Sequence, residues 1–241
     1  MSKIGYGYGS EWHLLSYLGR HRSELNDRIQ ATTGARRVDW LDFPTQHPDR
    51  GRIDAEWKGL DFLNDPVIQT EWREIWPHRA GVQNWDAVAR IDVDGRDERL
   101  LVEAKGHCGE IASNCAAKVE GGLNQIRAAL EATKRALGVD ASHDWLNGYY
   151  QFCNRLAVLQ FLASHNIRAH LLFVYFTGDF TAGRDCPKDE VGWQSAIKAQ
   201  DERIGLPAQH PLRERVHKLF LPVFIDLYEP SGSLHDPASQ S

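Results

Sequence analysis

The chain has 241 residues, of which 42% are hydrophobic and 25% are charged, a composition typical of a soluble globular protein with a substantial core. Its formal net charge of -5 argues against a protein that coats nucleic acid, although a local basic groove remains compatible with it. No apolar signal region opens the chain, and no run approaches the ~20 apolar residues of a membrane span. We therefore expect a cytoplasmic protein with no membrane partner.

The cysteines indicate the same compartment. Cys108, Cys115, Cys153 and Cys186 show no Cys-x-x-Cys spacing, so free thiols in a reducing environment are the simplest interpretation. A zinc site built from Cys108 and Cys115 together with His107 fits no common zinc-binding spacing.

The first part of the chain predicts two helices and a short strand. Ser10 is expected to be the N-cap of one long helix that continues through residues 11–30. A short strand is expected within residues 36–43. A second helix is expected over residues 66–76, with Pro66 in its first turn and Pro77 ending it.

Residues 84–106 contain the clearest local signal, a β-hairpin. Two alternating segments flank the pair Asp94-Gly95, which favours a two-residue hairpin loop. In that register Val93 pairs with Arg96, and the numbers of paired residues sum to 189.

The later elements alternate between helix and strand. Gly138 is expected to end the first of these helices by adopting a left-handed conformation. A single domain over residues 1–228 is expected, with a disordered tail over residues 229–241. The expected elements are helices at 114–137 and 145–165, a buried strand at 167–179, a helix at 190–203 and an apolar segment at 216–228.

The hairpin register places two carboxylates opposite each other. Asp86 and Glu103 sum to 189, so their Cβ atoms are expected roughly 4.5–5.5 Å apart. Because side chains alternate with period two, Lys105 shares their face. The opposite face carries Ala87, Ala89, Ile91, Val93, Leu100 and Val102 and is expected to be the core side. An odd-length loop without a bulge would reverse this arrangement.

Two carboxylates this close repel, so one pKa should rise unless a cation lies between them. Mg²⁺ suits such a site because it is a hard ion that prefers oxygen ligands, and the backbone carbonyl of Ala104 is a further candidate ligand. Lys105 would lie beside the metal-bound water, where it can orient that water or stabilise charge on a phosphate. The pattern indicates metal-assisted phosphodiester hydrolysis. The alternative is a solvated face with ordinary salt bridges.

At these residues the sequence resembles the PD-(D/E)XK nuclease superfamily, which has the restriction-endonuclease-like fold. The matching residues are Asp86 in "NWDAVARI" and Glu103-Ala104-Lys105 in "LLVEAKG"; Trp85, not proline, precedes the aspartate. The resemblance implies an α/β (α+β mixed sheet) core of helix, three-stranded meander, helix and strand. Residues 10–32, 84–105, 145–165 and 168–176 can supply it, so the core covers about residues 10–178, with additional helices.

The resemblance also implies an activity. Asp86 and Glu103 would bind Mg²⁺, with Mn²⁺ as the expected substitute, and Lys105 would serve the attacking water. The implied partner is nucleic acid, preferentially DNA, and restriction-type enzymes often form homodimers. The alternative within the same fold is a catalytically silent module that binds nucleic acid or protein.

Other side chains are candidates for supporting roles. Glu11 resembles a first-helix glutamate that some branches of the superfamily place near the metal, although a glutamate in a first helical turn also favours the helix dipole. Glu71 and Glu74 are the competing choices.

Gln151, Asn154 and Arg155 form one polar stripe on the expected helix 145–165, and Arg155 could hold a phosphate or steady Glu103. A structural salt bridge is the alternative. Ser113 and Asn114 are candidate phosphate contacts at a helix start, with an N-cap as the alternative.

Overall fold

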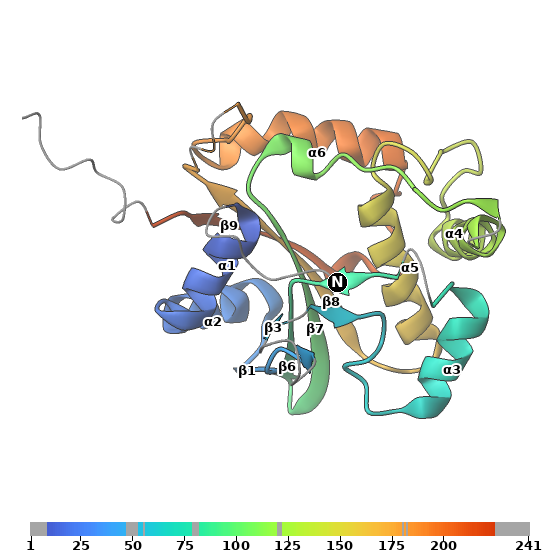
Figure 1. Cartoon of the computed structure of the whole chain (residues 1–241), viewed down its shortest axis with the longest axis horizontal. Coiled ribbons are helices and arrows are strands. Elements are labelled where there is room, and N and C mark those ends of the chain that lie inside the picture. Colours follow the sequence, from blue (N-terminus) through green and yellow to red (C-terminus); the bar gives the residue numbers. More distant parts are fainter. Residues whose placement is uncertain are drawn as a thin grey trace, which may run out of the picture.

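The computed structural model describes residues 9–46, 53–54, 56–78, 82–119, 122–179, 181 and 183–224, so the expected tail at 229–241 lies outside it. Its centre is a mixed five-stranded sheet (Figure 1), with strand order β1-β6-β7-β8-β9. The first two pairings are antiparallel and the last two are parallel. The strands are β1 (Arg37–Trp40), β6 (Ala87–Val93), β7 (Arg96–Lys105), β8 (Ala169–Thr177) and β9 (Val216–Pro222). The expectation of a mixed α/β protein is confirmed.

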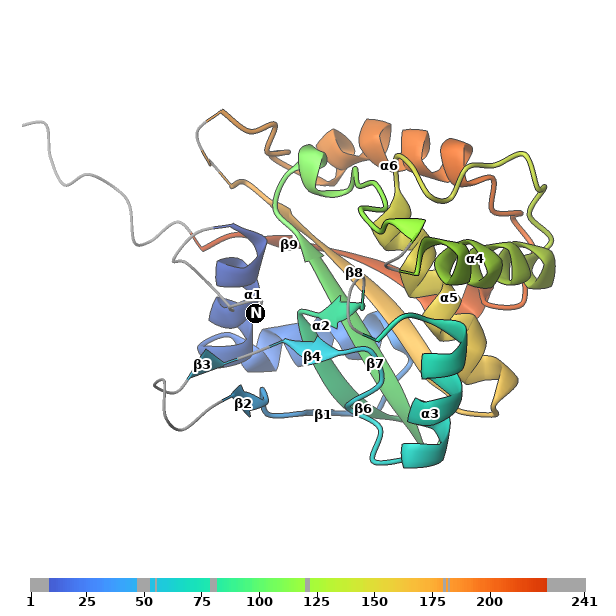
Figure 2. The same ribbon diagram turned by 45° about the vertical axis from the view of Figure 1, so that its right-hand side comes forward.

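Two N-terminal helices cover one face of this sheet (Figure 2). The prediction of one long helix is wrong, because α1 (Ser10–Gly19) ends and α2 (Arg22–Thr33) begins in a new direction. The backbone N–H groups of Arg20 and His21 both bond to the carbonyl of Ser16, which closes the last turn of α1. The N-cap is Gly9 and not Ser10, which is the first helical residue.

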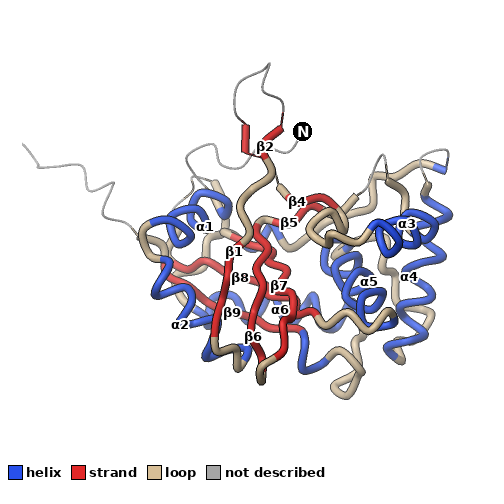
Figure 3. The backbone as a smooth tube through the Cα atoms, turned by 90° about the horizontal axis from the view of Figure 1, so that it is seen from below, coloured by secondary structure: helices blue, strands red, loops and turns tan. Residues whose placement is uncertain are grey.

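The other face is covered by α5 (Tyr150–Ser164) and α6 (Glu190–Ile204), while α4 (Leu123–Leu137) packs on the outer side of α5 and α3 (Pro66–Ile75) packs beside α4 and α5 (Figure 3). Helix α3 and its proline start agree with the sequence prediction, and so does the left-handed Gly138 that closes α4. Helix α4 begins later than expected, since residues 114–119 form an irregular segment. None of the helices that the structure describes combines the length and apolar character that a membrane crossing needs.

Both faces of the sheet are buried, which corrects the expectation of a single core side. The face with Ala87 and Val102 packs against α1 and α2 as predicted. The face that carries Glu103 also contributes Leu101, Phe173 and Tyr175 to a second, larger apolar cluster beneath α5 and α6. The strand that ends in Glu103 and Lys105 is therefore enclosed on both sides.

Two short ribbons extend the fold beside the main sheet. One pairs β2 (Thr45–Gln46) with β3 (Ile53–Asp54), and the other pairs β4 (Trp57–Lys58) with β5 (Asn84–Trp85). The indole of Trp85 is fully buried and donates a hydrogen bond to the carbonyl of Gly59 at 2.8 Å. This contact anchors the second ribbon immediately before Asp86, where the chain enters β6.

Candidate active site

The hairpin has the register that the sequence predicts. Val93 pairs with Arg96 and Ala87 pairs with Val102, as predicted, but the pairing ends there, and Asp86 lies in a bend before β6. The backbone N–H of Asp86 bonds to the carbonyl of Val102, the partner of Ala87, at 3.2 Å, so Asp86 and Ala87 both lie opposite Val102, as in a β-bulge. The predicted pairing of Asp86 with Glu103 is therefore wrong: Asp86 lies beside Glu11 and Leu14 of α1, whereas Glu103 meets Arg155 of α5.

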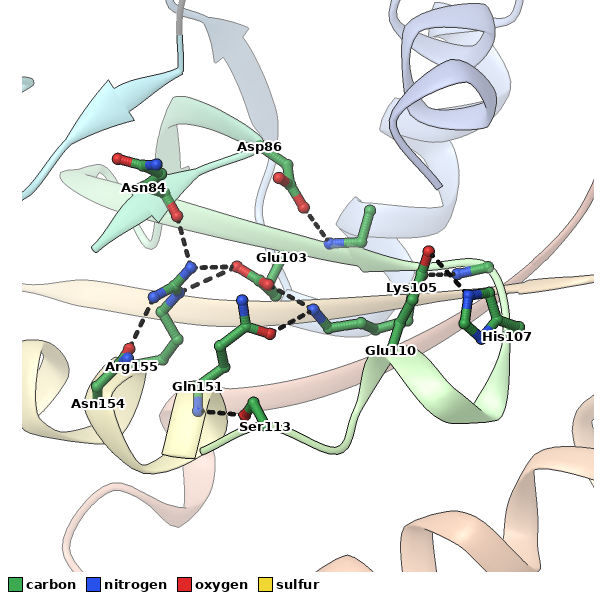
Figure 4. A network of polar contacts seen from close by, with 12 residues as sticks. Asn84, Asp86, Glu103, Lys105, His107, Glu110, Ser113, Gln151, Asn154 and Arg155 are labelled. Carbon is green, nitrogen blue, oxygen red and sulfur yellow. Dashed lines mark hydrogen bonds and ion pairs between the residues drawn. The ribbon is translucent and has the colours of Figure 1, made fainter. Parts of the chain in front are cut away.

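Glu103 is almost completely buried and is held by two cations (Figure 4). Lys105 Nζ lies 2.6 Å from Glu103 Oε1. Arg155 donates from Nε at 3.0 Å and from Nη2 at 2.7 Å to Glu103 Oε2. Of the roles that the sequence left open for Arg155, contact with Glu103 is the one present, and each carboxylate oxygen of Glu103 has its own cationic partner.

Arg155 is itself fixed by three further groups. It donates to the backbone carbonyl of Asn84 at 2.6 Å and to the side chain of Asn154 at 2.7 Å. Its guanidinium lies over the Trp85 ring, 4.9 Å from the centroid, which is favourable cation–π geometry. Arg155 on α5 therefore points at Glu103, and β5 supplies its two other neighbours, the carbonyl of Asn84 and the ring of Trp85.

Lys105 connects Glu103 to the start of α5. Besides its contact with Glu103, Lys105 Nζ lies 3.1 Å from Gln151 Oε1. The backbone N–H of Gln151 donates to the hydroxyl of Ser113 at 2.8 Å. Ser113 therefore acts as a cap, but of α5 and not of the helix that follows it in sequence. Asn114 accepts from the backbone N–H of Gly148, so it also braces this helix start.

Asp86 faces a second group of acids. Its Oδ2 accepts a hydrogen bond from the backbone N–H of Ala104 at 2.6 Å. Asp86 also lines a small gap between α1 and the hairpin together with Glu11 and Glu56. The sequence prediction that places Glu11 near the site is therefore supported, whereas the competing Glu71 pairs with His165 at 2.8 Å.

The pKa values of Asp86 and Glu103 are shifted in opposite directions. Burial raises the pKa of Asp86 well above its usual value, and the charges of Glu103 and, more weakly, Glu56 add to the rise against the opposing effects of Lys105 and the Ala104 N–H. Burial also acts on Glu103, but Arg155 and Lys105 outweigh it and hold its pKa below the usual value. The expected pKa rise thus falls on Asp86 alone.

The chemistry of these side chains fits a hard divalent cation, because Glu11, Glu56 and Asp86 supply carboxylate oxygens around one gap. Their present positions do not form a coordination sphere: within the described ranges, no three His, Cys, Asp or Glu side chains are grouped to hold an ion. His107, Cys108 and Cys115, the zinc-site alternative, likewise form no such group within the described ranges, and all four cysteines are free.

Sequence reasoning missed Glu56, which is buried although it lies in a segment without recognisable periodicity. It also missed the roles of Asn84 and Trp85, because a backbone carbonyl acceptor and a cation–π partner leave no pattern in a single sequence. Asn84 and Trp85 form β5, whose pairing with β4 holds both residues beside Arg155.

The comparisons with known proteins return no relative: no family model, no curated protein and no solved structure matches the chain.

Proposed function

We propose that the chain is a Mg²⁺-dependent nuclease of the PD-(D/E)XK type, acting preferentially on DNA. The observation that carries the proposal is the juxtaposition of Asp86, Glu103 and Lys105 at the end of one hairpin. The order of α1, the antiparallel strands β1, β6 and β7, then α5 and β8 is compatible with a restriction-endonuclease-like core.

The metal would be held by Asp86 and Glu103, with Glu11 and Glu56 beside them and the Ala104 carbonyl as a candidate. When bound, such a cation supplies Lewis-acid stabilisation of a phosphoryl oxygen and lowers the pKa of a bound water. Cation binding would also relieve the repulsion between Asp86 and Glu103 that raises the pKa of Asp86.

The chain's own contribution centres on Lys105. An ammonium has three N–H donors, and within the described residues Lys105 directs its hydrogen bonds to two acceptors, Glu103 and Gln151. The third donor is available to orient a water or to stabilise charge that develops on a phosphate oxygen. Ser113 and Arg155 act as positioning residues, since each fixes a partner of Lys105.

One observation favours a second candidate, a catalytically silent binding module. Lys105 is only 7% exposed and Glu103 only 3% exposed, and both oxygens of Glu103 are already occupied by cations. An ion pair of this kind can serve as a structural element of the fold without meeting a substrate.

A cleavage assay separates the two candidates. Supercoiled and linear DNA, single and double stranded, and RNA would be incubated with the full chain in Mg²⁺, Mn²⁺ or EDTA. If the chain is a nuclease, cutting should require the metal and should disappear in Lys105→Met. The exposed control Lys118→Met should still cut. Metal-dependent binding of DNA without any cutting by the folded chain would favour the silent module.

A further inference from the structure

A second polar cluster lies near the start of β7, at the opposite end of the strand from Lys105. Glu98 is 1% exposed, and its carboxylate accepts hydrogen bonds from Arg215 and, at 2.8 Å, from His170 Nε2. Arg168 Nη1 lies 3.5 Å from its other oxygen. His170 Nδ1 is 2.8 Å from His217 Nε2, so the cluster spans β7, β8 and β9.

The charges in this cluster do not cancel. One carboxylate, Glu98, faces two guanidinium groups, Arg168 and Arg215. Burial lowers the pKa of both imidazoles, that of His217 to about 4, so the histidines add no positive charge at pH 7. Glu98, Arg168 and Arg215 together therefore carry one net positive charge at pH 7.

Both arginines also line a cavity of about 420 Å³ between the end of α5, the turn into β8 and the short helix η4 (Arg213–Arg215). Their side chains are 47% and 29% exposed, so the excess charge faces this space. Within the described residues, Nε and Nη2 of both arginines have no hydrogen-bond partner. The volume lies in the range of small-molecule pockets.

The rest of the lining determines which anion would fit. The lining contains no acidic side chain among the described residues, and Leu159, Ala163 and Leu212 form an apolar wall beside the arginines and Asn166. A guanidinium presents a planar set of donors that matches phosphate oxygens. An anion with an uncharged body would therefore use both parts of the cavity.

We propose that this cavity is a binding site for a small phosphate monoester, with the phosphate on Arg168 and Arg215 and its organic body against the apolar wall. The site is independent of the proposed nuclease activity, because the cavity lining includes none of Asp86, Glu103 and Lys105. Glu98 acts as a positioning residue that holds the two guanidinium groups together.

Isothermal titration calorimetry on the full chain in EDTA tests this, with adenosine 5′-monophosphate as the probe and adenosine as the phosphate-free control. Saturable binding of the monophosphate is expected at or below about 1 mM, with adenosine at least about tenfold weaker. Arg168→Gln should weaken monophosphate binding by about fivefold or more. Arg213→Gln, which makes the same charge change next to the cavity but does not line it, should leave binding within about twofold of the native chain.

Three results would overturn the proposal. One is the absence of saturable monophosphate binding by the folded native chain. Another is binding that Arg168→Gln leaves unchanged. The third is binding that is lost in Lys105→Met, because the probe would then occupy the proposed nuclease site. Binding that survives in Lys105→Met supports this cavity whether or not the chain proves to be a nuclease.

Discussion

Arg155 and Glu103 form a buried ion pair in which two guanidinium donors share one carboxylate oxygen, Oε2. This geometry leaves Oε1 to Lys105 at 2.6 Å. Arg155 therefore decides which oxygen of Glu103 meets the lysine, and it fixes the orientation of that carboxylate relative to Asp86. The pair links α5 to the end of β7, two elements that are far apart in the sequence.

Removal of Arg155 should strongly destabilise the fold. Arg155→Met leaves Glu103 buried with only Lys105 as a cationic partner, so we expect a loss of about 3–5 kcal/mol in the free energy of unfolding. Urea denaturation measures this. The control Arg127→Met lies on the exposed face of α4 and should change stability by less than about 0.5 kcal/mol. A similar small effect at Arg155 would show that the pair is not structural.

Mg²⁺ should stabilise the native chain through the acidic group at Asp86. A ligand that binds only the folded state adds about 2.7 kcal/mol at a concentration 100 times its dissociation constant. Thermal denaturation with increasing Mg²⁺ should show this rise for the native chain and for Asp65→Asn, a helix-cap control whose amide can still cap α3. The rise should be absent in Asp86→Asn and reduced in Glu56→Gln. Equal Mg²⁺ effects in all four proteins would place the cation elsewhere.

Stability should fall as the pH is lowered from 7 toward 4 because of the cluster around His217. Burial lowers the pKa of His217 from 6.5 to about 4, so protonation favours the unfolded chain. Its stabilising contribution is complete above pH 6.5 and is lost progressively as the pH falls to 4. We expect His217 to account for about 2 kcal/mol over this range, allowing for the part of the ring that faces water.

Urea denaturation at several pH values checks this slope. His217→Gln should flatten it, since the amide can still reach His170 but does not titrate in this range. His78→Gln, at an exposed position after α3, should leave the slope as in the native chain. An unchanged slope in His217→Gln would contradict the assignment.

The parts of the fold that the sequence predicts are those governed by local chemistry. Asp94-Gly95 set the hairpin register from the Val93–Arg96 pair to the Ala87–Val102 pair, but not the position of Asp86. Pro66 and Gly138 marked the start of one helix and the end of another. The grouping of Gln151, Asn154 and Arg155 on one face of α5 also follows from local spacing.

The errors arise where tertiary packing overrides local preference. Residues 11–30 have continuous helical character, yet the chain reorients at Arg20 and His21 so that Leu25 and Ile29 can also reach the sheet. Ser113 resembles the cap of the following helix but caps α5 across the fold. Glu56 and the Glu98 cluster depend on contacts between distant segments, which a single sequence does not reveal.

In the proposed nuclease, Asp86, Glu103 and Lys105 form one metal-dependent hydrolytic centre. The most direct test is the single-turnover cleavage rate on the best DNA substrate, compared among the native chain, Asp86→Asn, Lys105→Met and the control Lys118→Met. We expect each site variant to lose about 10²–10⁴-fold in rate, with a native circular dichroism spectrum, while the control keeps its rate. Cleavage that persists at the native rate in either folded site variant would contradict the assignment of this centre.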